Sequence, residues 1–227
     1  MSTLILFDFD GTFADTAPDM AQAANRQRAL RSMPPLPEAT LRNYVSMGAR
    51  GMVKISLDID PDHPEFEQAK QDFLTDYENN CTDQTRLFDG IPELLQEIRQ
   101  ANMQWGIVTN KATRYAQPIL NWLNLPDCAV LVCGDTTPHS KPHPLPLLHA
   151  VELAGYQPNQ CLYVGDDLRD VEAAHAAGMP AVGVTYGYGS ELGQPAHTWN
   201  ADYLADHPVE IWTAVQSIVS NRMNSLS

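Results

Sequence analysis

The segment Thr3-Leu4-Ile5-Leu6-Phe7-Asp8-Phe9-Asp10-Gly11-Thr12 decides how the rest of the sequence is interpreted. An apolar run that ends in acidic residues and glycine predicts a buried strand whose carboxyl end enters a loop. Side chains alternate along a strand, so Asp8 and Asp10 leave on the same side, about 7 Å apart, while Phe9 faces the other way. Gly11 permits a sharp turn there. Since ligands of open parallel sheets bind at the carboxyl ends of strands, we expect both carboxylates to face one pocket.

Four further apolar runs have the same character, and segments with helical periodicity separate them. Alternating strands and helices predict an α/β fold, in which a Rossmann-like parallel sheet carries helices on both faces. The predicted strands are 3–9, 104–109, 129–133, 161–164 and 181–184, and the predicted helices between them are 92–101, 113–123, 144–154 and 168–177.

One long interval interrupts this alternation. Between about residues 16 and 86 the sequence shows no convincing strand, but it has three stretches with helical periodicity, at 19–30, 41–57 and 65–79. We therefore expect a helical cap domain, residues 16–86, inserted into a core formed by residues 1–15 and 87–227. The hinges are expected at 13–18 and 85–90.

The composition narrows the class of protein. The 227 residues include 28 acidic and 14 basic side chains, and the net charge of −14 would repel nucleic-acid phosphates and anionic lipids. The four cysteines have no C-x-x-C spacing, so we expect reduced core thiols and a reducing compartment. No apolar run approaches the length of a membrane span. We therefore expect a cytoplasmic protein whose partner is neither a nucleic acid nor a membrane.

A second acidic cluster, Gly165-Asp166-Asp167-Leu168-Arg169-Asp170, follows another predicted strand. If a helix begins near Asp167, then Asp166 and Asp170 lie four residues apart and can face the same way. Capping of that helix would explain one or two of these acids, but not all three. Converging carboxylates raise one another's pKa unless a cation lies among them, and carboxylate oxygens suit Mg²⁺. The sequence therefore predicts a magnesium site.

Two smaller motifs follow other predicted strands. Thr109-Asn110 ends the second strand and offers a hydroxyl and backbone N–H groups to phosphate oxygens. Lys141-Pro142 comes after the third strand and a short loop, and Pro142 keeps Lys141 out of helical geometry, so its ammonium is free to point at a ligand. Each motif is weak alone. Their value lies in the shared position at strand ends. The chain has only four lysines, Lys54, Lys70, Lys111 and Lys141.

Taken in order, D-F-D-G-T, T-N, K-P and G-D-D-x-x-D resemble the haloacid dehalogenase superfamily of phosphotransferases. The resemblance covers the whole chain and implies that the helical insertion is the family's mobile cap. It also implies that Asp8 is the nucleophile and Asp10 the general acid and base. A carboxylate that attacks phosphorus forms an aspartyl-phosphate and divides hydrolysis into two steps. The dehalogenase branch lacks the second aspartate, so Asp10 favours phosphate chemistry.

The resemblance further assigns the residues that bind phosphate and metal. It implies that the phosphoryl group is bound by Thr109, Asn110 and Lys141. It implies that Mg²⁺ is held by Asp8, the backbone carbonyl of Asp10, Asp166 and, directly or through a ligand, Asp170. The metal and the ammonium would neutralise the negative charges that otherwise oppose attack on phosphate.

The expected cap contains Tyr44-Val45-Ser46-Met47-Gly48-Ala49-Arg50-Gly51, which resembles the cap of phosphoglycolate phosphatases. There a glycine-bearing turn, here at Gly48, faces the active site. Arg50 could pair with a substrate carboxylate, although a position on a solvated helix face explains it equally well. Residues 186–189 and 199–202 also resemble this subfamily and its close relative, N-acetylmuramic acid 6-phosphate phosphatase. We therefore expect a small phosphorylated metabolite with a carboxylate, first 2-phosphoglycolate and, as the alternative, N-acetylmuramic acid 6-phosphate.

Other functions have weaker support. A phosphonate hydrolase of this fold needs a cap lysine, for which Lys54 and Lys70 are the candidates. A sugar phosphatase or phosphomutase is a further alternative, but a phosphomutase needs a second phosphate site, for which Arg50 is a thin basis. From a different class, a phospho-acceptor module places its accepting Asp after a central strand, whereas here D-x-D-G-T comes first. A non-catalytic binding protein would not require the complete set of motifs. We expect a monomer or a homodimer.

Overall fold

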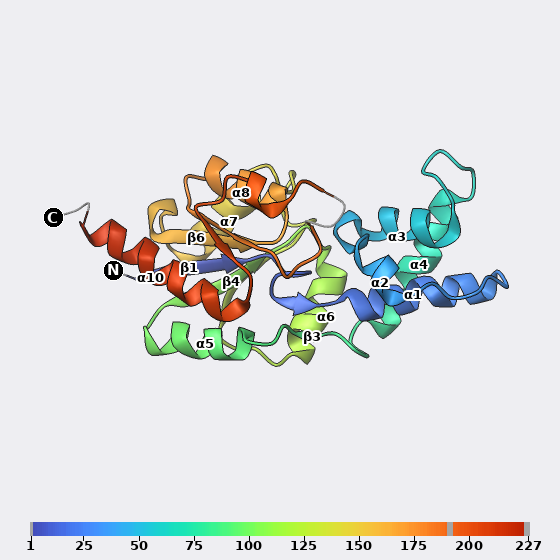
Figure 1. Cartoon of the computed structure of the whole chain (residues 1–227), viewed down its shortest axis with the longest axis horizontal. Coiled ribbons are helices and arrows are strands. Elements are labelled where there is room, and N and C mark those ends of the chain that lie inside the picture. The colour runs from blue at the N-terminus through green and yellow to red at the C-terminus, as the bar shows by residue number, and fades with distance from the viewer. Residues whose placement is uncertain (1, 190–192, 225–227) are drawn as a thin grey trace.

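The computed structural model describes residues 2–189 and 193–224 and has two lobes (Figure 1). The larger lobe contains a six-stranded parallel sheet in the order β5-β4-β1-β6-β7-β8. Its strands are β1 (Leu4–Phe7), β4 (Gln104–Val108), β5 (Cys128–Val132), β6 (Cys161–Gly165), β7 (Ala181–Val184) and β8 (Tyr203–Ala205). Residues 1, 190–192 and 225–227 of the predicted core lie outside the described residues. The expected α/β fold with a Rossmann-like sheet is confirmed.

Strand β1 lies inside the sheet, and its side chains divide the core into two layers. Leu4 and Leu6 belong to one layer and Ile5 and Phe7 to the other, as the two-residue period of a strand requires. The first layer also contains residues of α7 and α8, and the second contains residues of α5, α6 and α10. These helices are α5 (Ile91–Gln100), α6 (Thr113–Trp122), α7 (Leu145–Ala154), α8 (Leu168–Ala176) and α10 (Pro208–Asn224). All four β1 side chains are buried, which explains why this strand is an uninterrupted apolar run.

Most core elements lie where the sequence pattern predicts them, with ends that differ by one or two residues. Strand β8 and helix α10 were not predicted. Strand β1 ends at Phe7, earlier than expected, so Asp8 and Asp10 lie in the connection that follows it. The backbone N–H of Asp8 still donates to the carbonyl of Val164 at 2.8 Å. Sheet geometry therefore reaches Asp8 but not Asp10.

The smaller lobe consists of helices that pack on one another at one end of the molecule (Figure 1). They are α1 (Ala17–Leu30), α2 (Glu38–Arg42), the 3₁₀ helix η1 (Val45–Met47), α3 (Gly48–Leu57) and α4 (Phe66–Asn80). The prediction of a single helix over 41–57 is wrong. Gly48 has a φ of +61°, outside the range of a right-handed helix, so the chain turns there and α3 begins in a new direction.

A short antiparallel pair joins the two lobes. Strand β2 (Ala14–Asp15) pairs with β3 (Arg86–Leu87), with Ala14 opposite Leu87 and Asp15 opposite Arg86. The chain therefore enters and leaves the smaller lobe through adjacent segments, and both strands fall inside the predicted hinges. The assignment of residues 16–86 to a separate cap domain stays a prediction. Two further 3₁₀ helices, η2 (Pro158–Gln160) and η3 (Ala196–Thr198), lie in the larger lobe.

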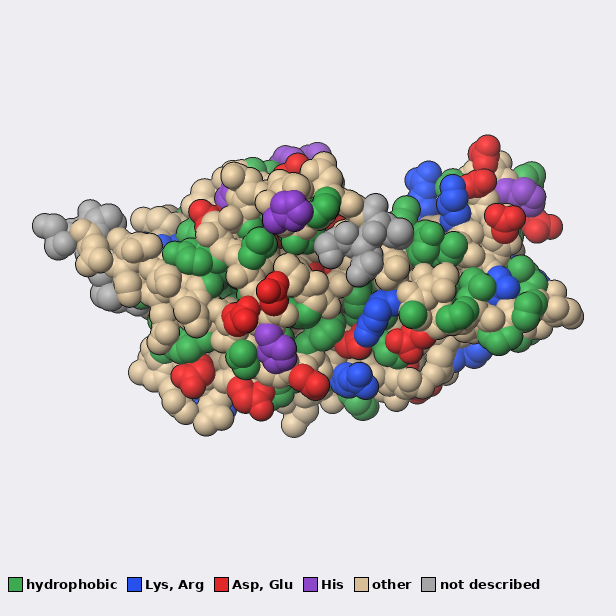
Figure 2. Space-filling view, in the orientation of Figure 1, with side chains coloured by type: hydrophobic (Ala, Val, Ile, Leu, Met, Phe, Trp, Pro, Cys, Tyr) green, Lys and Arg blue, Asp and Glu red, His purple; other side chains and the backbone are tan. Residues whose placement is uncertain are grey.

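Charge is unevenly distributed over the surface. On the face shown in Figure 2, the larger groups of Lys and Arg side chains lie over the smaller lobe and its junction with the larger lobe, whereas acidic side chains are spread over both. In a chain with a net charge of −14, the basic side chains visible on this face therefore gather toward the smaller lobe and the junction. Among the described residues, no helix combines the length and the apolar character needed to span a membrane.

Candidate active site

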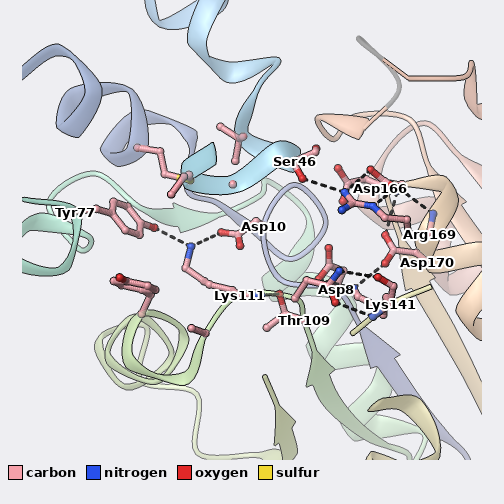
Figure 3. Close-up of a pocket in the computed structure, with 18 of the residues that line it drawn as sticks. Asp8, Asp10, Ser46, Tyr77, Thr109, Lys111, Lys141, Asp166, Arg169 and Asp170 are labelled. Atoms are coloured by element: carbon pink, nitrogen blue, oxygen red, sulfur yellow. Dashed lines mark hydrogen bonds and ion pairs between the residues drawn. The ribbon is translucent and has the colours of Figure 1, made fainter. Parts of the chain in front are cut away.

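A cavity lies between the two lobes, at the carboxyl ends of β1, β4 and β6 (Figure 3). It encloses about 860 Å³ of space outside the protein atoms, including the part that is open to solvent. The larger lobe lines it mainly with polar side chains, and the smaller lobe contributes most of its apolar wall. The polar residues from the larger lobe are Asp8, Asp10, Thr109, Asn110, Lys111, Lys141, Asp166, Asp167, Arg169 and Asp170. All the core residues predicted to bind phosphate or metal therefore line one cavity.

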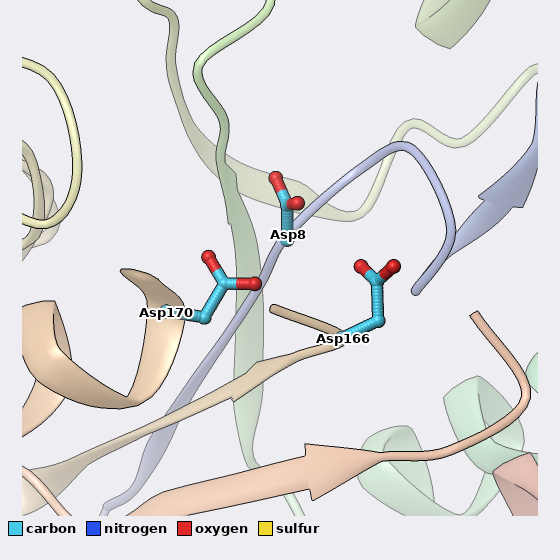
Figure 4. A group of neighbouring side chains, drawn as sticks. All are labelled: Asp8, Asp166 and Asp170. Atoms are coloured by element: carbon cyan, nitrogen blue, oxygen red, sulfur yellow. The ribbon is translucent and has the colours of Figure 1, made fainter. Parts of the chain in front are cut away.

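Three predicted metal ligands come together in this cavity. Asp8, Asp166 and Asp170 each offer a carboxylate oxygen, and these oxygens all lie within 4.8 Å of one another (Figure 4). Asp8 follows β1, Asp166 follows β6, and Asp170 lies in the first turn of α8. We call these three residues the acid trio. Its members are brought together by the parallel pairing of β1 with β6, as expected from the positions of the two acidic motifs.

Asp166 is held in place by Thr12, Gly187 and Tyr188. Its carboxylate accepts hydrogen bonds from the hydroxyl of Thr12 and the backbone N–H of Tyr188, both at 2.8 Å. A Cβ atom on Gly187 would lie 2.3 Å from the Cβ of Asp166, so only glycine fits at that position without movement. Burial raises the pKa of Asp166 well above the ordinary range, and the charges of Asp8 and Asp170 raise it further.

Asp170 takes part in the cap of helix α8 and also lines the cavity. Helix α8 begins after Asp167, whose carboxylate accepts from the backbone N–H of Arg169, and Asp170 accepts in turn from the backbone N–H of Asp167. Capping therefore explains Asp167 and part of the role of Asp170, but not Asp166. Burial raises the pKa of Asp170, and the ammonium of Lys141 offsets only part of that shift.

Lys141 is the ammonium that faces the acid trio. Its Nζ lies 2.8 Å from Asp8 Oδ1 and 2.7 Å from Asp170 Oδ1, and it donates to the hydroxyl of Tyr163 at 2.7 Å. Burial lowers the pKa of Lys141, but Asp170 and Asp8 raise it more strongly, so it remains an ammonium. The side chain of Asn110 fixes the backbone of Lys141 through two hydrogen bonds, of 2.9 and 3.0 Å. Asn110 thus positions Lys141, and its amide is already paired.

The donor set of the acid trio fits Mg²⁺. Three carboxylates surround one point, and within the described residues only one ammonium, that of Lys141, pairs with them. Asp8 Oδ1 is buried and accepts no hydrogen bond of ordinary geometry from any described residue, although Lys141 is near. An incompletely satisfied, electron-rich oxygen beside two further carboxylates is the environment that a hard divalent cation stabilises.

Asp10 lies in the same cavity but outside the acid trio. Its Oδ1 accepts from Lys111 Nζ at 2.9 Å and from the hydroxyl of Thr16 at 2.5 Å. Lys111 also donates to the hydroxyl of Tyr77 on α4, at 3.0 Å. Burial lowers the pKa of Lys111, but Asp10 and Tyr77 raise it more strongly, so its charge is retained. The carboxylates of Asp8 and Asp10 therefore have different partners, and metal binding by the Asp10 carbonyl stays a prediction.

The structure places the predicted cap residues differently from one another. Gly48 lines the cavity, whereas Arg50 is exposed on α3 and is not among the described residues that line it. This position agrees with a solvated helix face, the second explanation offered by the sequence. Thr109 is buried at the end of β4 and also lines the cavity, and its role in phosphate binding stays a prediction.

Several residues of the cavity were missed by the sequence analysis. Lys111 follows Thr109-Asn110 directly and is one of only four lysines, and that combination could have singled it out. Arg169 lies inside the acidic motif; its guanidinium pairs with Asp167 and donates to the backbone carbonyl of Ser46, at 3.0 Å. Tyr77 carried no local signal, because its contact with Lys111 joins positions far apart in the chain.

Most of the chain matches a known protein family. A sequence model of the family described as haloacid dehalogenase-like hydrolase matches residues 5–184. The chain belongs to this family. The match includes all the catalytic and binding residues predicted for the larger lobe, together with the helices of the smaller lobe.

Relatives of this haloacid dehalogenase-like hydrolase carry two different substrate names. An N-acetylmuramic acid 6-phosphate phosphatase of Pseudomonas aeruginosa is 45% identical over 208 residues, which are 91% of this chain and 92% of that protein. A phosphoglycolate phosphatase of Xanthomonas campestris pv. campestris is 44% identical over 209 residues, 92% and 94% of the two chains. The expected membership and enzyme class are confirmed: this haloacid dehalogenase-like hydrolase is a phosphatase.

A solved structure has the same architecture. The crystal structure of a predicted phosphoglycolate phosphatase from Haemophilus somnus covers 94% of this chain and 98% of its own, with a TM-score of 0.81 and 28% identity. Because the alignment spans both lobes, the likeness includes the helical insertion as well as the sheet.

Proposed function

We propose that this haloacid dehalogenase-like hydrolase is a Mg²⁺-dependent phosphomonoesterase that acts through an aspartyl-phosphate on Asp8. The observation that carries the proposal is the placement of Asp8. Its carboxylate lies beside the ammonium of Lys141 and within 4.8 Å of Asp166 and Asp170, on a cavity between the lobes. Asp170 also lies beside Lys141, but its side chain is only 2% exposed, against 15% for Asp8, and it accepts from the backbone N–H of Asp167, so Asp8 is the more accessible of the two from the cavity.

In the first step a carboxylate oxygen of Asp8 bonds to phosphorus, and the bond between phosphorus and the ester oxygen breaks. In the second step water attacks the aspartyl-phosphate, which releases phosphate and restores the carboxylate. The ammonium of Lys141 reduces the repulsion between Asp8 and the phosphate, and Asn110 keeps Lys141 in place. The hydroxyl of Thr109 donates a hydrogen bond to a phosphoryl oxygen.

Mg²⁺ would be held by Asp8, Asp166 and Asp170, and would supply neutralisation of the phosphate charge. Asp10 donates a proton to the leaving oxygen and later accepts one from the attacking water. Lys111 and Thr16 hold its carboxylate at the cavity wall. A general acid must be able to reach the leaving oxygen, and Asp10 lines the same cavity as Asp8, with Lys111 in place of Lys141 as its partner.

We further propose that residues 16–86 form a cap that closes over the larger lobe. Two contacts support this function: Arg169 donates to the carbonyl of Ser46, and Lys111 donates to Tyr77. Each joins a residue beside the catalytic motifs to the smaller lobe across the cavity. A closed cap excludes bulk water from the reacting groups while the substrate is bound.

For the substrate we propose a small phosphate ester of a carboxylic acid. The two relatives described above are named for N-acetylmuramic acid 6-phosphate and for phosphoglycolate, and both compounds contain a carboxylate. The cavity favours the larger compound, because its wall includes Met20, Val45, Phe73 and Leu74, and a glycolate group offers almost no apolar surface to them. 2-Phosphoglycolate remains the second candidate, supported by the phosphoglycolate phosphatases among the relatives.

We also infer a cytoplasmic location. The four cysteines, Cys81, Cys128, Cys133 and Cys161, are free thiols, as is usual in a reducing compartment. A monomeric or homodimeric state stays a prediction.

Phosphate release tests the proposed function. We expect hydrolysis of both esters in the presence of Mg²⁺, loss of activity on chelation, recovery when Mg²⁺ is restored, and at least about a thousandfold lower kcat in Asp8→Asn. Asp127→Asn, at an exposed position on the larger lobe, is the matched control and should retain activity. Turnover by Asp8→Asn near the level of the unsubstituted protein would contradict the assignment.

A further inference from the structure

We propose that Lys111 and Tyr77 form a second anion site in the cavity, which binds the carboxylate of the substrate's leaving group. The inference rests on the proposed phosphatase function, since it concerns the half of the substrate that does not react. It assigns to these two residues the task for which the sequence suggested Arg50.

The two residues lie on the side of the cavity where the leaving group is expected. Figure 3 shows the Lys111 ammonium between Tyr77 and Asp10, with Asp8 and Lys141 on the far side of Asp10. A phosphoryl group held at Asp8 and Lys141 therefore directs its ester oxygen toward Asp10, and the remainder of the molecule toward Lys111.

Lys111 is a buried cation with an unused donor. Its side chain is only 7% exposed, yet it lines the cavity. An ammonium has three N–H groups, and Lys111 uses two of them, toward Asp10 and Tyr77. Within the described part of the chain its third N–H has no partner. A buried cation with a free donor beside open space is a ready partner for an anion.

Tyr77 provides the second unused donor. Its hydroxyl oxygen accepts from Lys111, but its own O–H group has no acceptor among the described residues. The ring is buried and packs against Phe73 and Tyr115, with centroids at 6.3 and 5.7 Å, so the hydroxyl has little freedom to move. The two donors come from different lobes and meet in one place. A carboxylate has two acceptor oxygens and can satisfy both at once.

The charge of the surroundings favours a carboxylate over a second phosphate. Lys111 already shares its charge with Asp10, whose Oδ1 lies 2.9 Å from Nζ. The ammonium of Lys111 carries one positive charge, which matches the single charge of a carboxylate and offsets only half of the charge of a dianionic phosphate. A singly charged carboxylate makes a smaller demand. Arg50 is exposed and outside the described lining of the cavity, so it does not add a second charge.

The test compares pairs of esters that differ in the carboxylate. N-acetylmuramic acid 6-phosphate is paired with N-acetylglucosamine 6-phosphate, which lacks the lactyl acid, and 2-phosphoglycolate is paired with its amide. We expect kcat/KM to favour the acid of each pair. Lys111→Met should reduce that preference about tenfold or more, and Tyr77→Phe should reduce it less, because the charge remains. Lys111→Arg should retain most of it.

Lys54→Met is the matched control, because Lys54 lies on an exposed part of the smaller lobe and pairs with Asp60. It should leave the preference unchanged. Should Lys111→Met lose measurable turnover, the same ratio is obtained from dissociation constants in the Asp8→Asn background. A preference that is absent in the unsubstituted protein, or unchanged in Lys111→Met, would overturn the proposal. Failure of the unsubstituted protein to hydrolyse any of the four esters with Mg²⁺ would instead contradict the proposed function.

Discussion

Arg42 on α2 holds the carboxylate of Asp15 with two parallel hydrogen bonds, each 2.6 Å long. Asp15 lies in β2, at the point where the chain enters the smaller lobe, and it also accepts from the hydroxyl of Tyr188. The backbone N–H of Tyr188 in turn donates to Asp166. The packing of the smaller lobe against its hinge is therefore connected, through one tyrosine, to a member of the acid trio.

We predict that Arg42→Met lowers the free energy of unfolding by about 2 kcal/mol, because it leaves the carboxylate of Asp15, which is only 4% exposed, without its main cation. Arg99→Met is the control. The Arg99–Asp127 pair is 70% and 50% exposed, and its loss should cost less than about 1 kcal/mol. Urea unfolding measures both variants, and equal losses would show that the hinge pair has no special role.

Asn110→Ala should lower kcat about tenfold to a hundredfold, because it removes the two hydrogen bonds that fix the backbone of Lys141. Asn121→Ala changes an exposed side chain on α6 and should leave kcat unchanged. Steady-state kinetics with saturating Mg²⁺ provides the comparison. If Asn110→Ala raised KM alone, the side chain would have to contact substrate directly.

Gly187→Ala should weaken Mg²⁺ binding about tenfold or more, since a Cβ there would lie 2.3 Å from the Cβ of Asp166 and displace that carboxylate. Gly155→Ala is the control: no atom lies within 4 Å of its Cβ position, so only the cost of its positive φ of +75° remains. Both variants should lose stability, but only Gly187→Ala should need more Mg²⁺ for half-maximal activity. Identical Mg²⁺ titrations of the two variants would contradict the claim that Gly187 keeps the carboxylate of Asp166 in position for Mg²⁺.

The stabilisation of the protein by Mg²⁺ should increase with pH. Burial raises the pKa values of Asp166 and Asp170 above the ordinary 3.8 in the metal-free protein, so the folded state holds their protons more tightly than the unfolded state. The tighter binding of these protons stabilises the folded state fully below pH 3.8, and this stabilisation is lost as the pH rises through the raised pKa values. Binding of Mg²⁺ requires the deprotonated forms.

We therefore expect a larger Mg²⁺-induced rise in Tm at about pH 8 than at about pH 5.5, and release of protons when Mg²⁺ is added to weakly buffered protein near neutral pH. The double variant Asp166→Asn/Asp170→Asn should show neither effect. A rise in Tm that is the same at both pH values would mean that these two carboxylates are already ionised in the metal-free protein.

The sheet and the acid trio could be predicted because their signals are local. Strand β1 is buried on both faces, so its sequence is a continuous apolar run. The acids that follow it indicate the edge of the sheet where ligands bind. The pairing of β1 with β6 then brings the two acidic motifs together without further information. The Arg42–Asp15 pair and the Lys111–Tyr77 contact could not be found in this way, because they join segments whose relative position depends on the packing of the two lobes.

In the helical lobe, even a local feature, the turn at Gly48, could not be predicted from the helical pattern of the sequence. Residues 41–57 have a helical pattern, but Gly48 adopts a φ of +61° and the chain turns there. The turn places η1 against the cavity and Arg50 on the exposed side of α3. Glycine permits such a turn without requiring it, so the sequence alone did not separate a continuous helix from a broken one.

The most direct test of the mechanism is to detect a phosphoryl group on Asp8 by mass spectrometry during turnover. With p-nitrophenyl phosphate, whose leaving group needs no protonation, Asp10→Asn should still form the aspartyl-phosphate but hydrolyse it slowly. We predict that rapid acid quenching followed by mass spectrometry finds one phosphoryl group on a peptide that contains Asp8, that the group is released by hydroxylamine, and that Asp8→Asn/Asp10→Asn lacks it. Continued turnover by Asp10→Asn without any phosphoryl group on Asp8 would contradict the central claim that Asp8 is the nucleophile.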